Sequence, residues 1–242
     1  EVVRVVTPGT AIEDSILEDT SNNYVVALYE ASGERWGVGL ADVSTGFFAL
    51  TEVSGEDAQG KLLNELVSRE VREILLPEDL AADMLRPLLA ERRIAITRRP
   101  PDEFRHQFAR PLLLEQFRVQ SLEGFGAEEL DAGVCAAGAL LQYLRDTQRN
   151  AVRHISNLRV HYGERNMVLD AVTQRSLELV SNLHGGTREG TLLSVIDRTQ
   201  TPMGARMLKT WVLQPLNERA EIEGRLEATG DLVDNLSLRT SL

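Results

Sequence analysis

Three short runs of Val, Leu and aromatic residues follow one another between residues 24 and 53. The runs 24–29, 36–43 and 47–53 have the β-branched and aromatic composition that is typical of strands. Two turns of Ser, Thr, Gly and Glu, at 32–34 and 44–46, separate them. Because strands joined by such short turns lie side by side in opposite directions, the sequence predicts an antiparallel three-stranded meander.

The pattern changes character after the meander. Residues 62–67 place Leu and Val on one helical face, and two short apolar runs, 71–76 and 94–97, enclose a second helical stretch at 79–90. Strands that alternate with helices are parallel neighbours joined by right-handed crossovers. The sequence therefore predicts a mixed α/β sheet covered by helices, an order compatible with an RNase H-like fold but not unique to it.

Two further segments, 102–117 and 130–144, have the apolar spacing of helices. The second carries Gly133, Ala136 and Gly138. Because these residues have little or no side chain, we expect this helix to lie very close to a neighbouring element.

A polar stretch at 148–160 separates this part from one with helical spacing throughout. We therefore predict two domains, an α/β domain at residues 1–150 and an all-α segment at residues 151–242. In the second domain, residues 172–183 are expected to form one helix, closed by the glycine pair 185–186 as a left-handed cap.

Thr201 and Pro202 mark the start of another helix, because Thr is a good N-cap and a proline at the first helical position loses no hydrogen bond. Met203, Met207 and Trp211 then recur every four residues and form one apolar face. We interpret this face as core packing.

The net charge of −11 is unevenly distributed. Residues 1–155 contain 26 Asp and Glu against 16 Lys and Arg, whereas residues 156–242 contain 11 against 10. Duplex DNA is a polyanion that proteins bind mainly through Lys and Arg. The first part is therefore a poor candidate for DNA contact and is better suited to bind another protein.

Several global features are typical of a cytoplasmic protein. No apolar run approaches the roughly 18 residues of a membrane helix, and no signal-peptide pattern opens the chain. A single cysteine fits a reducing compartment. Because the chain starts without Met and directly on a strand-like run, we expect an excised fragment.

Asp42, which precedes a Ser-Thr-Gly turn, is the strongest candidate for catalysis. Nucleases with an RNase H-like fold hold a metal at such an Asp, and the turn also resembles the phosphate-binding turn of actin-like kinases. Two-metal chemistry requires several convergent carboxylates, and we expect no interior acid on the strands 71–76 and 94–97. The kinase-like interpretation lacks a second phosphate loop. We therefore interpret Asp42 as a turn-shaping residue and predict no catalytic, cofactor or metal residues.

Other motifs receive structural interpretations. The segment 204–210 echoes a phosphate loop, but Leu208 replaces the second Gly that the motif requires. The four histidines lack zinc-ligand spacing, and Cys135 is expected to be a small buried hydrophobe. The arginine pairs 92–93 and 98–99 are interpreted as a solvated rim.

Four segments resemble the MutS family of DNA mismatch repair proteins. The strings DAVTQRSLELVSNLHGG (170–186) and TPMGARMLKTWVLQPL (201–216) are similar to its core domain. RVVTPGT (4–10) resembles the start of its connector domain, and CAAGALLQYLRDTQ (135–148) resembles the helix that closes it. The resemblance implies an RNase H-like connector domain followed by the start of the helical core/lever domain.

Complete members of that family read mismatches through a Phe-x-Glu motif and hydrolyse ATP in a domain that also forms the dimer. This chain has neither that motif nor a Walker loop. The resemblance therefore implies a non-catalytic fragment that couples DNA binding to the ATPase and recruits MutL. ATP, Mg²⁺ and self-dimerisation are expected in the missing ATPase domain. Mismatched double-stranded DNA is expected to bind chiefly through the rest of the full-length protein.

The MutL-docking surface of the family maps onto the helix near residues 110–115. The matching residues are Arg110, Pro111, Leu112 and Glu115. Pro111 in the middle of the helix departs from the expected pattern.

Two alternatives remain open. An RNase H-like nuclease or a nucleotide-binding enzyme would be centred on Asp42, and the nuclease needs at least two more carboxylates within metal-bridging reach. A structural scaffold without a partner surface needs no site at all.

Overall fold

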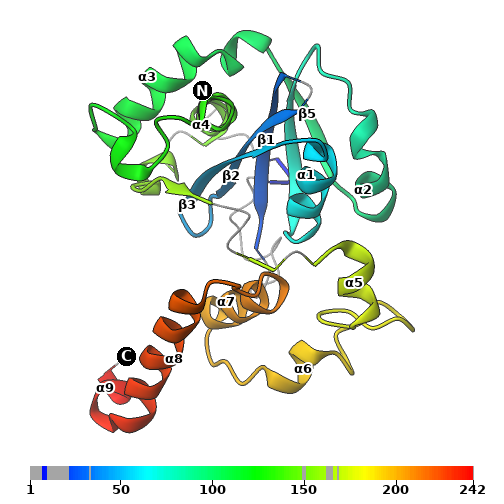
Figure 1. Ribbon diagram of the computed structural model, residues 1–242, viewed down its shortest axis with the longest axis vertical. Helices are drawn as coiled ribbons and strands as arrows, with labels where there is room; N and C mark the ends of the chain where they lie inside the picture. The colour runs from blue at the N-terminus through cyan, green and yellow to red at the C-terminus, as the bar shows by residue number, and fades with distance from the viewer. Residues whose placement is uncertain are drawn as a thin grey trace. The chain divides into compact units, whose positions relative to one another are not determined.

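Figure 1 shows the computed structural model, which describes residues 7–9, 22–32, 34–148, 151–161, 166–167 and 169–241. The chain divides into two compact units. Residues 1–163 with 198–206 are called the sheet unit, and residues 164–197 with 207–242 are called the helical unit.

A six-stranded mixed sheet forms the centre of the sheet unit, in the order β5-β4-β1-β2-β3-β6. β1, β2 and β3 pair antiparallel, whereas β4 is parallel to β1, β5 to β4 and β6 to β3. The predicted meander and the predicted parallel crossover are both confirmed. The strands are β1 (Tyr24–Ser32), β2 (Arg35–Asp42), β3 (Phe47–Ser54), β4 (Val71–Pro77), β5 (Ala95–Arg99) and β6 (Arg159–Val160).

Helices cover both faces of this sheet (Figure 1). One face packs with α3 and α4 around a core that includes Phe48 and Phe104, and the other packs with α1 and α2 around Trp36. Asp57 caps α1 by accepting from Gly60 N at 3.2 Å. The helices of this unit are α1 (Ala58–Val67), η1 (Asp83–Leu85), α2 (Arg86–Glu91), η2 (Pro101–Phe104), α3 (His106–Phe117), η3 (Glu123–Phe125), α4 (Asp131–Thr147) and η4 (Ala151–His154).

The expected close approach of the small-residue helix is confirmed. α4 crosses β2 where that strand carries Gly37 and Gly39. A Cβ added to Gly37 would lie 1.8 Å from the carbonyl oxygen of Ala132, and one added to Gly39 would lie 2.9 Å from Cα of Ala137. Glycines in the strand and small residues in the helix therefore make this packing possible.

Two predicted helices are interrupted. The stretch predicted at 79–90 consists of the single turn η1 followed by the short α2, and the stretch predicted at 102–117 divides into η2 and α3. Proline lies within the first two positions of both α2 and η2. Because proline has no N–H and disfavours helical backbone in the preceding residue, it starts a helix but does not continue one.

The polar stretch 148–160 contributes to the core of the sheet unit. Val152, Ile155 and Leu158 are buried, and Gln116 Nε2 donates to the carbonyl oxygens of Val152 and Ile155 at 3.0 Å each. β6 then adds to the edge of the sheet beside β3. The predicted domain boundary at residue 150 stays a prediction.

The described residues after 161 form helices, loops and one isolated bridge between Asn166 and Leu216. The helix predicted at 172–183 is wrong in length. It ends at Ser176, because Glu178 takes a left-handed conformation with φ of 47°. Val172 within α5 and Leu183 beyond it are both exposed. The helices are α5 (Ala171–Ser176), α6 (Leu192–Ile196), α7 (Pro202–Leu213), α8 (Arg219–Asp234) and α9 (Leu236–Ser241).

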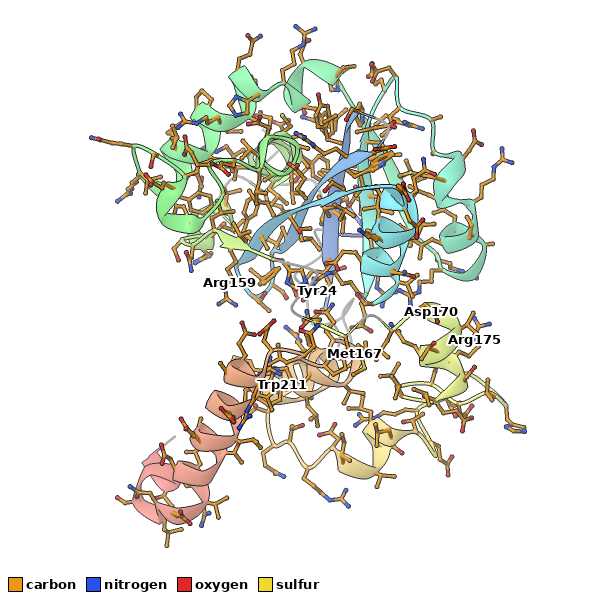
Figure 2. The ribbon with its side chains drawn as sticks, in the orientation of Figure 1. Tyr24, Arg159, Met167, Asp170, Arg175 and Trp211 are labelled. Atoms are coloured by element: carbon orange, nitrogen blue, oxygen red, sulfur yellow. The ribbon has the colours of Figure 1, made fainter. Side chains whose placement is uncertain are left out.

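The start of α7 is confirmed, but the interpretation of its apolar face is wrong. Thr201 Oγ1 accepts from Gly204 N at 3.1 Å, as an N-cap does. Met203 is 75% exposed and Met207 56% exposed, and Trp211 (labelled in Figure 2) is 39% exposed. An amphipathic spacing defines an apolar face but does not say which element covers it.

Candidate functional site

α3 positions the four residues that the sequence analysis assigned to partner docking. Its inner face, with Ala109, Leu113 and Phe117, is buried. The helix packs so tightly on α4 that a Cβ on Gly138 would lie 2.2 Å from Cβ of Ala109. A rigid inner face fixes which side chains α3 presents on its other side.

The outer face of α3 alternates charged and apolar groups. Arg110 Nη2 binds Glu128 Oε1 at 2.6 Å, and Arg145 Nη1 lies 3.3 Å from Glu115 Oε2. Pro111 is exposed within the helix, and Leu112 is half-buried against the core. The predicted docking residues therefore share one helix, but both of its charged members already have partners.

Sequence reasoning missed Phe108. Among the described residues between 7 and 161, it is the only large hydrophobic side chain that is exposed, at 42%. It lies three and four positions before Pro111 and Leu112, which is the spacing of one helical face. This spacing was the signal that could have identified it.

A buried polar cluster corrects the expectation that β4 carries no interior acid. Glu73 lies on β4 and is only 1% exposed. Thr97 Oγ1 and Tyr143 OH donate to its Oε1 at 2.6 Å each, and Thr7 Oγ1 and Gly9 N donate to its Oε2 at 2.7 and 3.0 Å. Alternation along β4 puts Glu73 on the same face as Leu75, which packs in the core with α3 and α4, whereas Ile74 and Leu76 pack on the opposite face.

The four donors to Glu73 come from three separate segments of the sheet unit. Burial, and then the hydrogen bond to Glu73, raise the pKa of the Tyr143 phenol above its usual value, so this group remains a donor. A Cβ on Gly9 would lie 2.8 Å from Cβ of Glu73, and only glycine therefore fits there. None of these four donors is a cation. The cluster is therefore structural: its hydrogen bonds connect residues 7–9, β5 and α4 to β4.

Asp42 shapes a turn, as interpreted from the sequence. Its Oδ1 accepts from Ser44 N at 3.0 Å and from Ser44 Oγ at 2.6 Å, and its carbonyl oxygen accepts from Thr45 N at 3.3 Å. Within the described ranges, no group of three or more His, Cys, Asp and Glu side chains lies close enough to hold a metal ion. The additional carboxylates that the nuclease alternative requires are therefore not gathered around Asp42 in that part of the chain.

The remaining motifs also have structural roles. Burial raises the pKa of the Cys135 thiol to about 12, which fits the expected buried hydrophobe. Segment 204–210 lies within α7. Arg159 lies over the Phe47 ring at 5.7 Å, and Phe47 meets Tyr24 edge-on at 5.8 Å. Figure 2 labels Arg159 and Tyr24 at one end of the sheet.

An ion cluster ties β6 to α1. Arg69 Nε and Nη2 donate to Glu65 Oε1 at 3.0 and 2.6 Å, and His161 Nε2 lies 3.4 Å from the same oxygen. Burial alone would raise the pKa of Glu65, but the charges of Arg69 and His161 and the hydrogen bond from Arg69 outweigh it and lower this pKa below its usual value.

We expect this cluster to make stability depend on pH in the acid range. Because the folded-state pKa of Glu65 is lowered, its stabilisation is complete above the unfolded-state pKa and is lost as the pH falls through the folded-state value. Glu65→Gln should cost about 2 kcal/mol of unfolding free energy at pH 7 and progressively less as the pH falls below about 4. Urea unfolding at several pH values measures this, with the exposed Glu56→Gln as control. A cost that does not change with pH would contradict it.

Comparison with known proteins identifies the class to which this α/β sheet unit and helical unit belong. Residues 23–156 match the family described as MutS domain II, and residues 172–242 match MutS domain III. These are consecutive domains of one class of DNA mismatch repair protein. The whole chain is 43% identical to the DNA mismatch repair protein MutS of Symbiobacterium thermophilum and 38% identical to that of Syntrophomonas wolfei.

The chain belongs to the MutS family. It spans 28% of the length of each of these two relatives. Among the described helices, none combines the length and the apolar composition needed to cross a membrane.

Proposed function

We propose that this chain is the connector and the first part of the core of a MutS-like mismatch recognition protein. In this proposal the α/β part is an RNase H-like domain, and the helical part leads toward the DNA-binding levers. The antiparallel meander β1–β3, extended on the β1 side by the parallel strands β4 and β5, supports the RNase H-like assignment, and β6 adds a parallel strand on the β3 side. ATP, Mg²⁺ and self-dimerisation belong to the ATPase domain of the longer, cytoplasmic protein.

The role of the chain is transmission and recruitment, not catalysis. The outer face of α3 docks MutL, and the exposed Phe108 beside Pro111 is the observation that carries this assignment. An aromatic anchor bordered by charged groups is the usual composition of a protein interface. Arg110 and Glu115, already engaged in ion pairs, would form the polar rim.

Mismatched duplex DNA is contacted chiefly by other parts of the full-length protein. The net charge of the first 155 residues supports this, since a region with 26 acidic against 16 basic residues repels a polyanion. We expect the chain alone to bind the MutL N-terminal domain and to show no tight, salt-dependent binding of mismatched DNA. Titrations of both partners in parallel measure this, and salt-dependent DNA binding would contradict the charge argument.

The docking face is tested by substitution. We expect Phe108→Ser to weaken binding of the MutL N-terminal domain about tenfold, because a truncated anchor typically costs more than about 1 kcal/mol. Charge reversal by Arg110→Glu or Glu115→Lys should weaken binding less, since rim charges contribute little. Glu123→Lys in η3, also an exposed acidic residue, is the matched control. Unchanged affinity in all three α3 variants would show that α3 is not the docking face.

A further inference from the structure

The outer edge of β5 carries backbone groups that no described residue binds. β5 is the last strand of the sheet and pairs only with β4. In a parallel ladder, alternate residues direct both N–H and C=O toward the neighbouring strand. Arg99 O accepts from Glu78 N just beyond β4 at 3.0 Å, which places Arg99 and Thr97 in the inward set. The N–H and C=O groups of Ile96 and Arg98 therefore point away from the sheet, and no hydrogen bond from the described part of the chain reaches them.

Two of the four arginines in residues 92–99 keep their charge unpaired beside this edge. Arg99 forms ion pairs with Glu103 and Asp146, and Arg92 donates to the carbonyl oxygens of Val67 and Arg69. Arg93 and Arg98 form no ion pair with any described carboxylate.

Arg98 Nη1 donates to the carbonyl oxygens of Pro77, at 2.8 Å, and Leu80. Both acceptors are backbone carbonyl oxygens, so no described carboxylate neutralises the charge of Arg98. Arg93 is exposed. The solvated rim expected from the sequence is thus confirmed for Arg93 and Arg98 and is wrong for Arg92 and Arg99, which are partly buried and bonded within the protein.

The outward N–H and C=O groups and the nearby arginines favour one class of binding partner over others. A nucleic-acid backbone supplies acceptors for N–H groups and guanidinium groups, but its phosphates cannot donate to the outward C=O groups of Ile96 and Arg98. A second copy pairing through β5 would bring its own arginines against these arginines. An extended peptide supplies both donors and acceptors at the spacing of a strand, as in strand addition to an exposed sheet edge.

We propose that the outer edge of β5 binds an extended acidic peptide segment of a partner protein. The segment adds a strand beyond β5, pairs its backbone with Ile96 and Arg98, and places carboxylates beside Arg93 and Arg98. This surface lies on a different element from the α3 docking face and does not depend on it.

The test uses the whole chain and a designed peptide, Glu-Val-Glu-Val-Glu-Val-Asp-amide with fluorescein on its N-terminus, and binding is measured as the rise in fluorescence anisotropy of the peptide. The expected result is that the peptide binds, whereas a counterpart with Lys at the acidic positions does not. Two further forms of the peptide are N-methylated on every second amide. In an extended peptide alternate amides face opposite edges, so each form blocks hydrogen bonding along one edge only. Because strand addition uses one edge only, one form should lose at least about tenfold in affinity and the other should keep it.

Variants of the chain locate the site. Ile96→Pro removes the outward N–H, and proline is tolerated where the N–H of an edge strand faces away from the sheet. It should weaken binding about tenfold, whereas Ile96→Val keeps the N–H and should bind normally. Arg93→Glu should weaken binding about fivefold. Arg105→Glu, an equal charge change at an exposed position after η2, is the control and should leave binding unchanged.

Several outcomes would overturn the proposal. Equal binding of both N-methylated peptides would mean that no strand is added. Displacement by a single-stranded oligonucleotide of equal charge would identify a general anion surface, and a concentration-dependent dimer lost in Ile96→Pro would identify a second copy as the occupant. If Ile96→Pro does not fold, the pair of N-methylated peptides decides the question with the unaltered chain.

Discussion

Replacing Glu73 with alanine is expected to lower the unfolding free energy of the sheet unit by about 3 to 5 kcal/mol, because a buried network then loses its common acceptor. Four donors, from Thr7, Gly9, Thr97 and Tyr143, would be left in a dry interior. Each unpaired donor carries a desolvation cost of about 1 to 3 kcal/mol, reduced where the structure relaxes or admits water.

The measurement uses urea unfolding followed by tryptophan emission. Trp36 is buried in the sheet unit and Trp211 lies in the helical unit, so a Trp211→Phe background makes Trp36 the only reporter. Glu73→Gln keeps the shape and one acceptor and should cost less than Glu73→Ala. Glu78→Ala, at an exposed position just after β4, is the control and should change stability by less than about 0.5 kcal/mol. If Glu73→Ala cost no more than this control, the cluster would contribute nothing to stability.

Replacing Gly37 with alanine is also expected to lower the unfolding free energy of the sheet unit strongly. Gly37 lies on β2 directly under α4, and a Cβ there would come within 1.8 Å of Ala132 O and 2.7 Å of Gly133 N. Both are backbone atoms, which cannot turn away as a side chain does. Gly37→Ala should therefore force α4 off the sheet and cost roughly 3 kcal/mol or more, the upper range for overpacking a dense core.

Gly124→Ala is the matched control for this variant, because a Cβ there meets nothing within 4 Å. We expect it to leave the unfolding midpoint nearly unchanged, and the same Trp36 emission assay applies to both. Because the added methyl group would clash with backbone atoms of α4, we expect no second side-chain substitution to restore the stability that Gly37→Ala loses. Unfolding midpoints that are equal for Gly37→Ala and Gly124→Ala would contradict the close packing of α4 on β2.

The elements of the sheet unit were largely predictable because their signals are local. The meander follows from the composition of three strands and the length of two turns, and the parallel strands follow from alternation with helices. The N-caps Asp57 and Thr201 act within three residues of the chain. The strings that resemble the MutS family lie within residues 4–216 and identified it without any tertiary information. Errors at this level were two helices interrupted near a proline and one helix cut short by a left-handed residue, where local backbone constraints overrode the apolar spacing.

The docking residues show the limit of this reasoning. Resemblance located Arg110, Pro111, Leu112 and Glu115 on α3, but only the fold showed that Arg110 faces Glu128 and that Glu115 faces Arg145. It also showed that Phe108 stays exposed. The exposure of a side chain depends on elements far along the chain, which no local pattern contains.

The sequence by itself determined the order of strands and helices, the close approach permitted by small residues in α4, and the family. The tertiary structure alone decided which polar groups are buried together and which edges stay open. Glu73 meets Gly9 across 64 residues of chain and Tyr143 across 70, and β5 ends the sheet because no described strand pairs beyond it. The physical reason is the range of the interactions. Caps, turns and helical periodicity act between neighbours in sequence, whereas burial and partner choice are set when distant segments pack together.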